Sequence, residues 1–345
     1  MKLGIGVSED LPVSVQQRLA ADVEAAGFAS LWTNEASGRD ALLVCQAWGA
    51  ATTALEVGVG VAPIWTRSPA QLAMAAATLQ EATGGRFVLG LGVSHPATMG
   101  RWHGAEVTRP LTAARETLTI LRQADAGTPT DLAGQVQSSR RFRLAITPRP
   151  PALRLHLAAM GPRMLELAGT MADGVLLNWS CPQAMADAGA RVRAAAATAG
   201  RDPADVEVAA YVRVAVADDP DAARAALAAQ IGQYAALPAY ASHFAQQGLG
   251  DAVTRVKAAH KQGANAAGLA EALGTPALEA LGFAGTPADA AGGFLDGLRD
   301  AELDHAVLRV VVVGDDPVDG VAAAIRAFDR FTAPPASSGL GADAG

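Results

Sequence analysis

The sequence has few cysteines, few aromatic residues and fewer positive than negative charges. Its 345 residues include 2 cysteines, 5% aromatic residues and a net charge of −7 at pH 7. Cys45 and Cys181 show no metal-ligand or redox spacing, which indicates a reducing, cytoplasmic location. The negative balance argues against a nucleic-acid partner, because binding a phosphate backbone requires a clustered positive surface.

Long apolar runs are missing as well. No stretch reaches the roughly 18 uninterrupted apolar residues that a membrane-spanning helix needs. The opening MKLGIGVSED turns polar before the core of a signal peptide is complete. We therefore expect no membrane span and no secretion signal. Because half of the residues are hydrophobic and many of these are alanine, closely packed helices on a sheet are favoured.

Short β-branched or leucine-rich runs alternate with alanine-rich amphipathic segments. The runs predict strands at 3–7, 30–33, 56–61, 87–91, 154–158, 174–178, 206–215 and 306–313. The segments predict helices at 13–26, 41–53, 69–83, 110–124, 162–171, 182–199, 221–236 and 317–331. Eight strand–helix units fit a (β/α)8 barrel, but a doubly wound sheet needs the same alternation, so the pattern alone leaves both folds open.

Three segments depart from this alternation. Residues 127–151 contain QSSRRFRLAITPRPP and predict a short extra hairpin. Residues 237–304 hold too much helical sequence for one crossover, so we predict a helical insertion before the last strand. The end of the chain, 332–345, is rich in small residues, proline and glycine, a composition typical of a disordered tail.

Polar clusters follow several predicted strands, at the face where a barrel carries its active site. After the second strand, Asn34 or a neighbour either caps the next helix or leaves Glu35 free to act as an acid or base. The third strand alternates Gly58 and Gly60. These glycines either relieve crowding inside a barrel or allow a flat ring to approach the strand, and the local sequence does not decide between the two.

The fourth strand alternates Gly90 and Gly92 and runs into a polar stretch at 93–104 that we interpret as a loop. The spacing fails the G-x-G-x-x-G dinucleotide fingerprint, which excludes that explanation of the glycines. His95 and His103 are not accompanied by a carboxylate or third histidine at recognisable spacing. We therefore predict no metal site here.

A further cluster lies where Gly161 and Pro162 begin a helix. Free backbone N–H groups are expected from Arg163 and Met164 at this helix start. An exposed helix N-terminus beside an arginine can bind a phosphate group, or it can be a helix start and nothing more.

Taken in order, these clusters resemble the bacterial luciferase-like superfamily of flavin- and deazaflavin-dependent oxidoreductases. The more specific segments are ATLQEATGGRFVLGLGVS, RPLTAARETLTILR and MGPRMLELAGTMADGVLLN, which occur in register. The similarity runs from LGIGV to about residue 180 and resumes in VLRVVVVGDDP. It implies a single (β/α)8 TIM-barrel domain over residues 1–331, with insertions near 127–151 and 237–304.

The resemblance also implies roles for individual residues. It places Asn34 and Glu35 beside a flavin or deazaflavin ring and a non-proline cis peptide at Gly60–Val61 behind that ring. The positions matching the binding of the cofactor's polar tail and phosphate are Val93, Ser94, Thr98, Met160, Gly161, Arg163, Met164 and Asn178.

Two positions depart from the related deazaflavin-dependent sugar dehydrogenases. Those enzymes have an aspartate–histidine pair where this chain has Asn34 and Glu35, and a glutamate in proton transfer where it has His95. Sugar chemistry is therefore in doubt, and either Glu35 or His95 is the expected catalytic proton carrier.

The resemblance implies an oxidoreductase that uses coenzyme F420 for hydride transfer to or from a small organic substrate at the barrel mouth. One alternative is an FMN-dependent monooxygenase, and a second is a non-catalytic flavin-binding protein. Relatives are usually homodimers. The substrate pocket is expected to be shaped by 127–151 and 237–304, whose basic residues either meet an anionic substrate or stay solvated: Arg140, Arg141, Arg143, Lys257 and Lys261.

Overall fold

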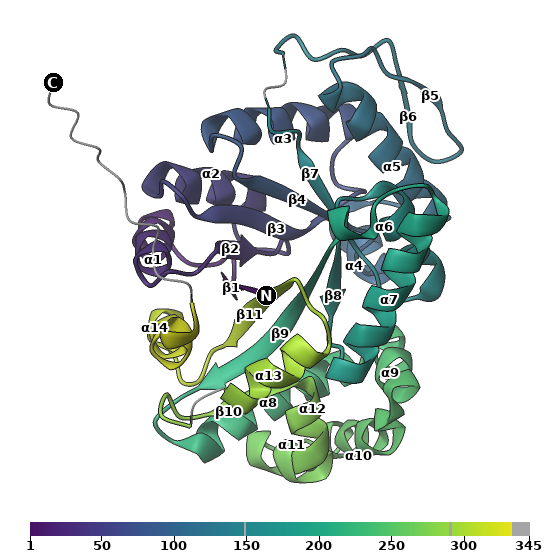
Figure 1. Cartoon of the computed structure of the whole chain (residues 1–345). Helices are drawn as coiled ribbons and strands as arrows, with labels where there is room; N and C mark the ends of the chain where they lie inside the picture. Colours follow the sequence, from purple (N-terminus) through teal and green to yellow (C-terminus); the bar gives the residue numbers. More distant parts are fainter. Residues whose placement is uncertain (148–149, 290–291, 333–345) are drawn as a thin grey trace, which may run out of the picture.

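Parallel strands close into an eight-stranded barrel in the computed structural model, which describes residues 1–147, 150–289 and 292–332 (Figure 1). Around the barrel lie β1 (Lys2–Gly6), β2 (Ser30–Thr33), β3 (Glu56–Pro63), β4 (Phe87–Gly92), β7 (Arg154–Ala158), β8 (Gly174–Asn178), β9 (Glu207–Val216) and β11 (His305–Val311). The ring is complete because β9 pairs with both β8 and β11, and β11 pairs with β1. The fold is therefore a (β/α)8 TIM barrel and not a doubly wound sheet.

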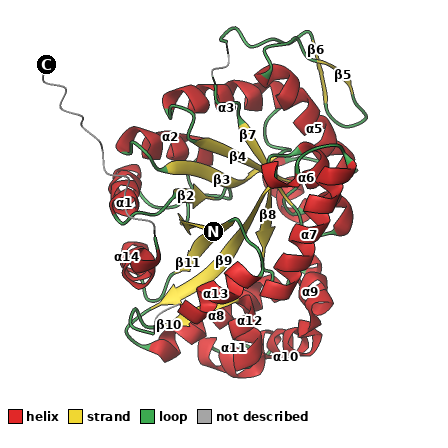
Figure 2. Cartoon of the chain, viewed as in Figure 1, coloured by secondary structure: helices red, strands yellow, loops and turns green. Residues whose placement is uncertain are grey.

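Helices form an outer ring around these strands (Figure 2). The helices that follow barrel strands are α1 (Val13–Ala25), α2 (Ala41–Ala51), α3 (Pro69–Ala82), α5 (Pro110–Asp125), α6 (Pro162–Met171), α7 (Pro182–Thr198), α8 (Pro220–Ala235) and α14 (Pro317–Phe328). Most begin with proline, which tolerates the first helical turn because its missing N–H needs no partner there. Side chains cap some starts, as when Asp40 accepts from the backbone N–H of Leu42 at 2.9 Å.

The extra hairpin predicted in 127–151 is present as β5 (Asp131–Ala133) and β6 (Ser138–Arg140). Glu116 of α5 anchors its turn, because its carboxylate accepts from the backbone N–H groups of residues 135–137 at 2.7–2.9 Å. Burial alone would raise the pKa of Glu116, but these N–H groups outweigh it and hold the pKa below its ordinary value. Residues 148–149 of this segment lie outside the described part of the chain.

The insertion predicted at 237–304 is mainly helical. Its elements are α9 (Pro238–Phe244), α10 (Gly250–Lys261), α11 (Ala266–Leu273), α12 (Thr275–Leu281), β10 (Gly282–Gly285) and α13 (Gly292–Asp300). The short strand β10, which the sequence did not predict, pairs in parallel with the end of β9. Helices α8 and α10–α12 share a separate apolar core with Trp179 and Phe244. Residues 290–291 are outside the described chain.

The chain end was predicted to be disordered from residue 332. Thr332 is described and donates its hydroxyl to the backbone carbonyl of Ala26 at 2.9 Å. Residues 333–345 lie outside the described part, so the prediction stays open there. Among the helices that are described, none combines the length and apolar character needed to cross a bilayer.

The barrel interior is layered along its axis. Its middle layer is apolar and includes Trp32, Val88, Leu176, Tyr211 and Val307, all buried. Since alternate strand residues face the same side, the interior residues nearer the amino ends of the strands form a layer at the base, and those nearer the carboxyl ends form a layer at the mouth. Both outer layers contain charged groups, and the two differ in how those charges are compensated.

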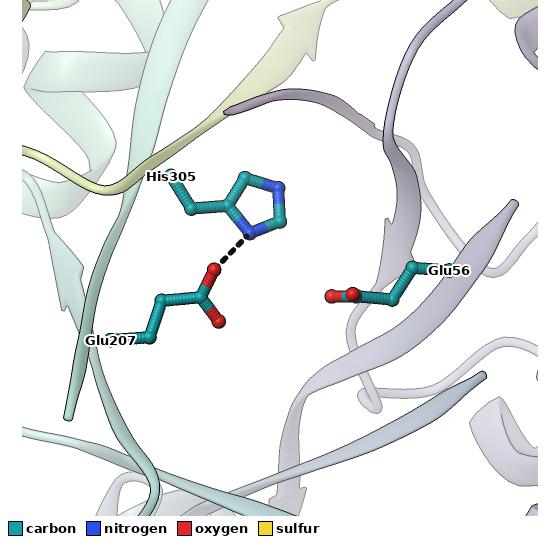
Figure 3. A group of neighbouring side chains, drawn as sticks. All are labelled: Glu56, Glu207 and His305. Carbon is teal, nitrogen blue, oxygen red and sulfur yellow. Dashed lines mark ion pairs between the residues drawn. The ribbon is translucent and has the colours of Figure 1, made fainter. Parts of the chain in front are cut away.

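At the base, the buried His156 and His305 and the partly buried Glu56 and Glu207 form a group that we call the base cluster. Figure 3 shows Glu56 and Glu207 turned toward each other, with His305 paired to Glu207. His305 Nδ1 and His156 Nε2 lie 3.3 and 3.2 Å from Glu207 oxygens. Burial would raise the pKa of Glu207, but the adjacent histidines outweigh it and hold the pKa far below its ordinary value.

Cations of the chain already neutralise the carboxylates of the base cluster. Arg154 lies 2.7 Å from Glu56, and Lys2 lies 3.2 Å from Glu207. Glu56, Glu207 and His305 place ligand-type atoms within 4.8 Å of one another, which is close enough to surround a metal ion. Because both carboxylates have a cationic partner, we interpret the cluster as a charge-balanced closure of the barrel base.

Candidate functional site

The polar stretch after β4 forms a helix, so our interpretation of 93–104 as a loop was wrong. Helix α4 spans Pro96–His103. Pro96 occupies its first turn, and Gly104 ends it in the left-handed conformation with φ 63°. These are ordinary helix start and stop signals, but they enclose only eight residues, and no apolar periodicity marks the segment. Ser94, with φ 54°, turns the chain from the strand into this helix.

A cavity of about 220 Å³ lies beneath α4 at the carboxyl end of the barrel. It brings together three of the predicted catalytic and cofactor-binding residues, namely Glu35, Ser94 and Thr98. The rest of its lining is Ala36, Pro63, Met99, Trp102 and His103. The loop after β2, the end of β3 and helix α4 therefore converge on one hollow, which presents both polar groups and an indole ring.

Glu35 is held in an ion pair and is not free. Arg67 Nη1 lies 2.7 and 2.8 Å from its two carboxylate oxygens, and Arg67 Nη2 lies 2.6 Å from Asp40. Both side chains of the Glu35–Arg67 pair are largely buried. Arg67 was not predicted from the sequence, although it follows β3 at the same end of the barrel. Asp40, and not Asn34, provides the cap of α2.

The Gly60–Val61 peptide is cis, as the resemblance implied. The ladder between β3 and β4 shifts register at this point, so Val61 lies at an irregularity with a partly exposed side chain. Crowding explains the neighbouring glycines. A Cβ on Gly58 would lie 2.6 Å from the Trp32 ring, and a Cβ on Gly60 would lie 2.5 Å from the Tyr211 hydroxyl. Of the two explanations for these glycines, the structure therefore supports relief of crowding inside the barrel.

The remaining predicted positions after β4 lie close to the cavity but do not line it. Val93 accepts a hydrogen bond on its backbone oxygen from the Trp65 indole at 2.8 Å. His95 directly precedes α4 and is partly exposed. Among described residues, no hydrogen-bond partner is found for the His95 side chain, so its ring nitrogens are available to another molecule.

The start of α6 agrees with the expectation of free N–H groups at Arg163 but not at Met164, whose N–H is used within the helix start. Gly161 precedes the helix, and a Cβ built on it would meet no atom within 4 Å, so the space above it is open. The N–H groups of Met164 and Leu165 bond to the Gly161 carbonyl at 3.1 Å. Within the described chain the N–H of Arg163 is not used, and its side chain is exposed, while Met160 is partly exposed.

Two asparagines predicted to contact the cofactor each accept a hydrogen bond from an arginine in this structure. Asn34 accepts a hydrogen bond from Arg309 of β11, and Asn178 accepts one from Arg213 of β9. Neither arginine was predicted from the sequence as a site residue. The available signal was a lone arginine inside an apolar strand, in YVRVAV and VLRVVV. A charge at such a position is unusual unless the strand faces a polar interior.

Both insertions reach the carboxyl ends of barrel strands. Gln137, in the hairpin turn, donates to the backbone carbonyl of Ile64 just beyond β3 at 3.3 Å. Asn178 Nδ2 donates to the Tyr240 hydroxyl of α9 at 3.1 Å. The basic residues considered for an anionic substrate are all exposed, and they are Arg140, Arg141, Arg143, Lys257 and Lys261.

Known proteins are similar to this chain in both sequence and fold. The chain is 34% identical over 232 residues to a 5,10-methylenetetrahydromethanopterin reductase of Methanolobus tindarius, covering 67% of this chain and 70% of that one. The coenzyme F420-dependent tetrahydromethanopterin reductase of Methanopyrus kandleri superposes with a TM-score of 0.80 at 23% identity, covering 95% and 97% of the two chains.

A second solved structure shows the same fold. An F420-dependent secondary alcohol dehydrogenase, in complex with an F420–acetone adduct, has a TM-score of 0.75 at 19% identity, covering 97% and 99%. The family described as luciferase-like monooxygenase matches residues 4–305. Because that match covers most of the chain and agrees with the barrel, the chain belongs to the luciferase-like monooxygenase family.

Proposed function

We propose that this luciferase-like oxidoreductase uses coenzyme F420 to transfer hydride to or from a small organic substrate at the barrel mouth. The observation that carries the proposal is the cavity beneath α4, which joins Glu35, Ser94 and Thr98 at the carboxyl ends of the strands. Support comes from the reductase relative at 34% identity and from the F420-dependent enzymes among the matching folds.

The groups at the mouth fit a flat ring with a polar, phosphate-bearing tail. The ring is proposed to lie against the cis Gly60–Val61 peptide, where Val61 is partly exposed. Ser94 and Thr98 offer hydroxyl groups to the tail. The free N–H and exposed guanidinium of Arg163, above the open space at Gly161, suit its phosphate.

When bound, the cofactor supplies the hydride chemistry, and the protein supplies position and electrostatics. The proton that accompanies hydride transfer is proposed to pass through His95, whose ring has no partner among described residues. Glu35 is less suited to this step, because both of its carboxylate oxygens already accept hydrogen bonds from Arg67. We therefore propose that Glu35 and Arg67 position the loop after β2 beside the ring.

The proposed tail site is tested with variants of the cofactor-binding residues. Ser94→Ala and Arg163→Ala should each weaken F420 binding by about tenfold, the value of one charge-assisted hydrogen bond. Arg18→Ala, on the outer helix α1, removes the same charge from an exposed position and should leave affinity unchanged. Equal affinity in all variants would rule out this tail site.

An FMN-dependent monooxygenase is the second candidate, favoured by the description of the matching family. The barrel mouth could hold either ring, since none of the contacts described above distinguishes them. Oxygen uptake separates the two functions. The F420 proposal predicts no substrate-dependent oxygen consumption with reduced FMN, whereas a monooxygenase would consume one oxygen molecule for each substrate molecule.

Two finer predictions rest on the same proposal. The insertions at 127–151 and 237–304 are proposed to shape the substrate pocket, since Gln137 and Tyr240 contact the ends of β3 and β8. Residues 1–331 are proposed to fold as a single domain, which limited proteolysis would test. That the protein is a homodimer and that it is cytoplasmic stay predictions. Light scattering on the purified chain tests whether it is a dimer.

A further inference from the structure

The mouth of the barrel carries two neighbouring arginines. Arg309 of β11 and Arg213 of β9 are register partners on adjacent strands. Each lies two residues beyond an interior residue, Val307 and Tyr211 respectively, so both belong to the mouth layer. Arg213 is 4% exposed. We call these two residues the arginine pair.

Within the described part of the chain, neither guanidinium has a carboxylate partner. Arg309 donates through Nη2 to Asn34, and Arg213 donates through Nη1 to Asn178. Both acceptors are uncharged amides. Arg309 Nη1 and Arg213 Nε are buried, and neither has a hydrogen-bond partner among the residues that the structure describes. In the described ranges, no ion pair includes either arginine, in contrast to the base cluster, where each carboxylate has a cation.

Packing holds the arginine pair in place. The Arg213 guanidinium lies 4.0 Å from the centre of the Trp179 ring, and that of Arg309 lies 5.9 Å from the Tyr211 ring. Arg309 passes over Gly6, where a Cβ would lie 3.1 Å from its Cδ. Burial lowers the pKa of Arg213 to about 10, and the nearby Arg309 adds to this lowering, so Arg213 is still a cation at neutral pH.

Two like charges side by side, partly removed from water, destabilise each other unless an anion lies nearby. The stacking on aromatic rings compensates only part of this cost. Free N–H groups on two fixed, planar guanidinium groups are well suited to carboxylate or phosphate oxygens. The missing partner is therefore an anion that another molecule supplies.

We propose that the arginine pair binds an anionic group, a carboxylate or phosphate, of the substrate. In the closed barrel, β11 lies on the opposite side from β4, and Ser94 and Thr98, proposed to hold the cofactor tail, follow β4. The assignment to substrate rests on the proposed function, whereas the anion site itself does not. Asn34 and Asn178 act as positioning residues, because each orients one guanidinium.

The anion site is tested on the purified chain without cofactor, with inorganic phosphate and acetate as probes. Asn34→Asp and Asn178→Asp change one atom each and supply the missing carboxylate within the protein. Each should weaken phosphate binding measured by calorimetry by at least about tenfold, because the added charge competes for the guanidinium. Asn265→Asp, at the start of α11 in the insertion, adds the same charge away from the barrel and should leave binding unchanged.

Stability gives a second measurement that does not depend on binding. Because aspartate would pair with an uncompensated guanidinium, Asn34→Asp should raise the midpoint of thermal unfolding by several degrees relative to Asn265→Asp. A lower midpoint in Asn34→Asp, or phosphate binding that survives in both aspartate variants, would overturn the anion site. Loss of phosphate binding in Arg163→Ala alone would assign the anion to the start of α6 and also overturn it.

A final measurement shows whether the anion belongs to the substrate or to the cofactor. If the anion belongs to the substrate, phosphate should still bind when the chain is saturated with F420. Asn34→Asp should still weaken that phosphate binding. Displacement of phosphate by F420 would assign the pair to the cofactor and contradict the substrate proposal. If F420 does not bind at all, the proposed function fails, but the phosphate measurements on the cofactor-free chain still decide the anion site.

Discussion

Arg67 Nη1 lies 2.7 and 2.8 Å from the two carboxylate oxygens of Glu35, and the same guanidinium reaches Asp40 through Nη2. One arginine therefore connects the end of β3 to the loop after β2 and to the start of α2. This contact changes the interpretation of Glu35. A carboxylate whose two oxygens both accept from one guanidinium is fixed in its orientation, which suits positioning better than proton transfer.

This relationship predicts different effects for the two candidate proton carriers. His95→Asn should lower kcat by at least about 10²-fold, the usual contribution of a general acid or base, with little change in cofactor affinity. Glu35→Gln should affect kcat less and lower stability, since it leaves Arg67 with Asp40 as its remaining charged partner. Steady-state kinetics and F420 titration of both variants check this. A larger loss of kcat in Glu35→Gln than in His95→Asn would indicate that Glu35 carries the proton.

The crowded glycines predict an effect on stability. Gly58→Ala places a Cβ 2.6 Å from the Trp32 ring and should cost about 1–3 kcal/mol, as overpacking of a core does. Gly297→Ala is the control, because a Cβ at that position of α13 meets no atom within 4 Å. It should be neutral or stabilise the helix by up to about 1 kcal/mol. Urea unfolding of both variants measures the difference, and equal stability would show that the barrel interior is not crowded there.

The base cluster predicts how stability depends on pH. The pKa of Glu207 is lower in the folded chain than its ordinary value, so the folded state binds fewer protons than the unfolded state. Its stabilising contribution is therefore complete above the ordinary pKa of about 4.3 and decreases as pH falls below that value. The unfolding free energy should decline less steeply with acidification in Glu207→Gln.

The matched control for this pH series is Glu166→Gln. The Glu166 carboxylate is half exposed and paired with Arg191 on the surface, where an ion pair contributes little. Its pH profile should therefore follow that of the unmodified chain. If Glu207→Gln and Glu166→Gln gave the same profile, the base cluster would not be the source of the acid sensitivity.

The hairpin anchor predicts a local effect. Glu116 accepts from three successive backbone N–H groups, of residues 135–137. Glu116→Gln removes the charge and at least one acceptor, so amide exchange at 135–137 should speed up while exchange in the barrel strands stays slow. Glu81→Gln, on the exposed face of α3, should alter neither region. Unchanged exchange at 135–137 would show that other contacts hold the turn.

Much of the barrel could be predicted from the sequence, because its elements carry strong local signals. The strands at Ser30–Thr33, Arg154–Ala158 and Gly174–Asn178 agree to the residue. Helix α4 was missed because its length of eight residues gives too few turns for an apolar period to appear. Strand β10 was missed because its four residues pair only with the distant end of β9.

The candidate site was less predictable, since its pairings join residues far apart in the chain. The closeness of Glu35, Ser94 and Thr98 followed from placing each at a strand end. The partners Arg67, for Glu35, and Arg309, for Asn34, depend on side-chain directions that local sequence does not encode. The Gly60–Val61 cis peptide was expected only through family resemblance, and the structure confirms it.

Equilibrium binding of F420 and of FMN to one preparation of the protein decides which cofactor it uses. The proposed function predicts a Kd for F420 in the micromolar range, at least about tenfold tighter than for FMN. It also predicts that Arg163→Ala weakens F420 binding and that Arg18→Ala does not. Tighter binding of FMN, or no binding of either cofactor below about millimolar concentration, would contradict the account.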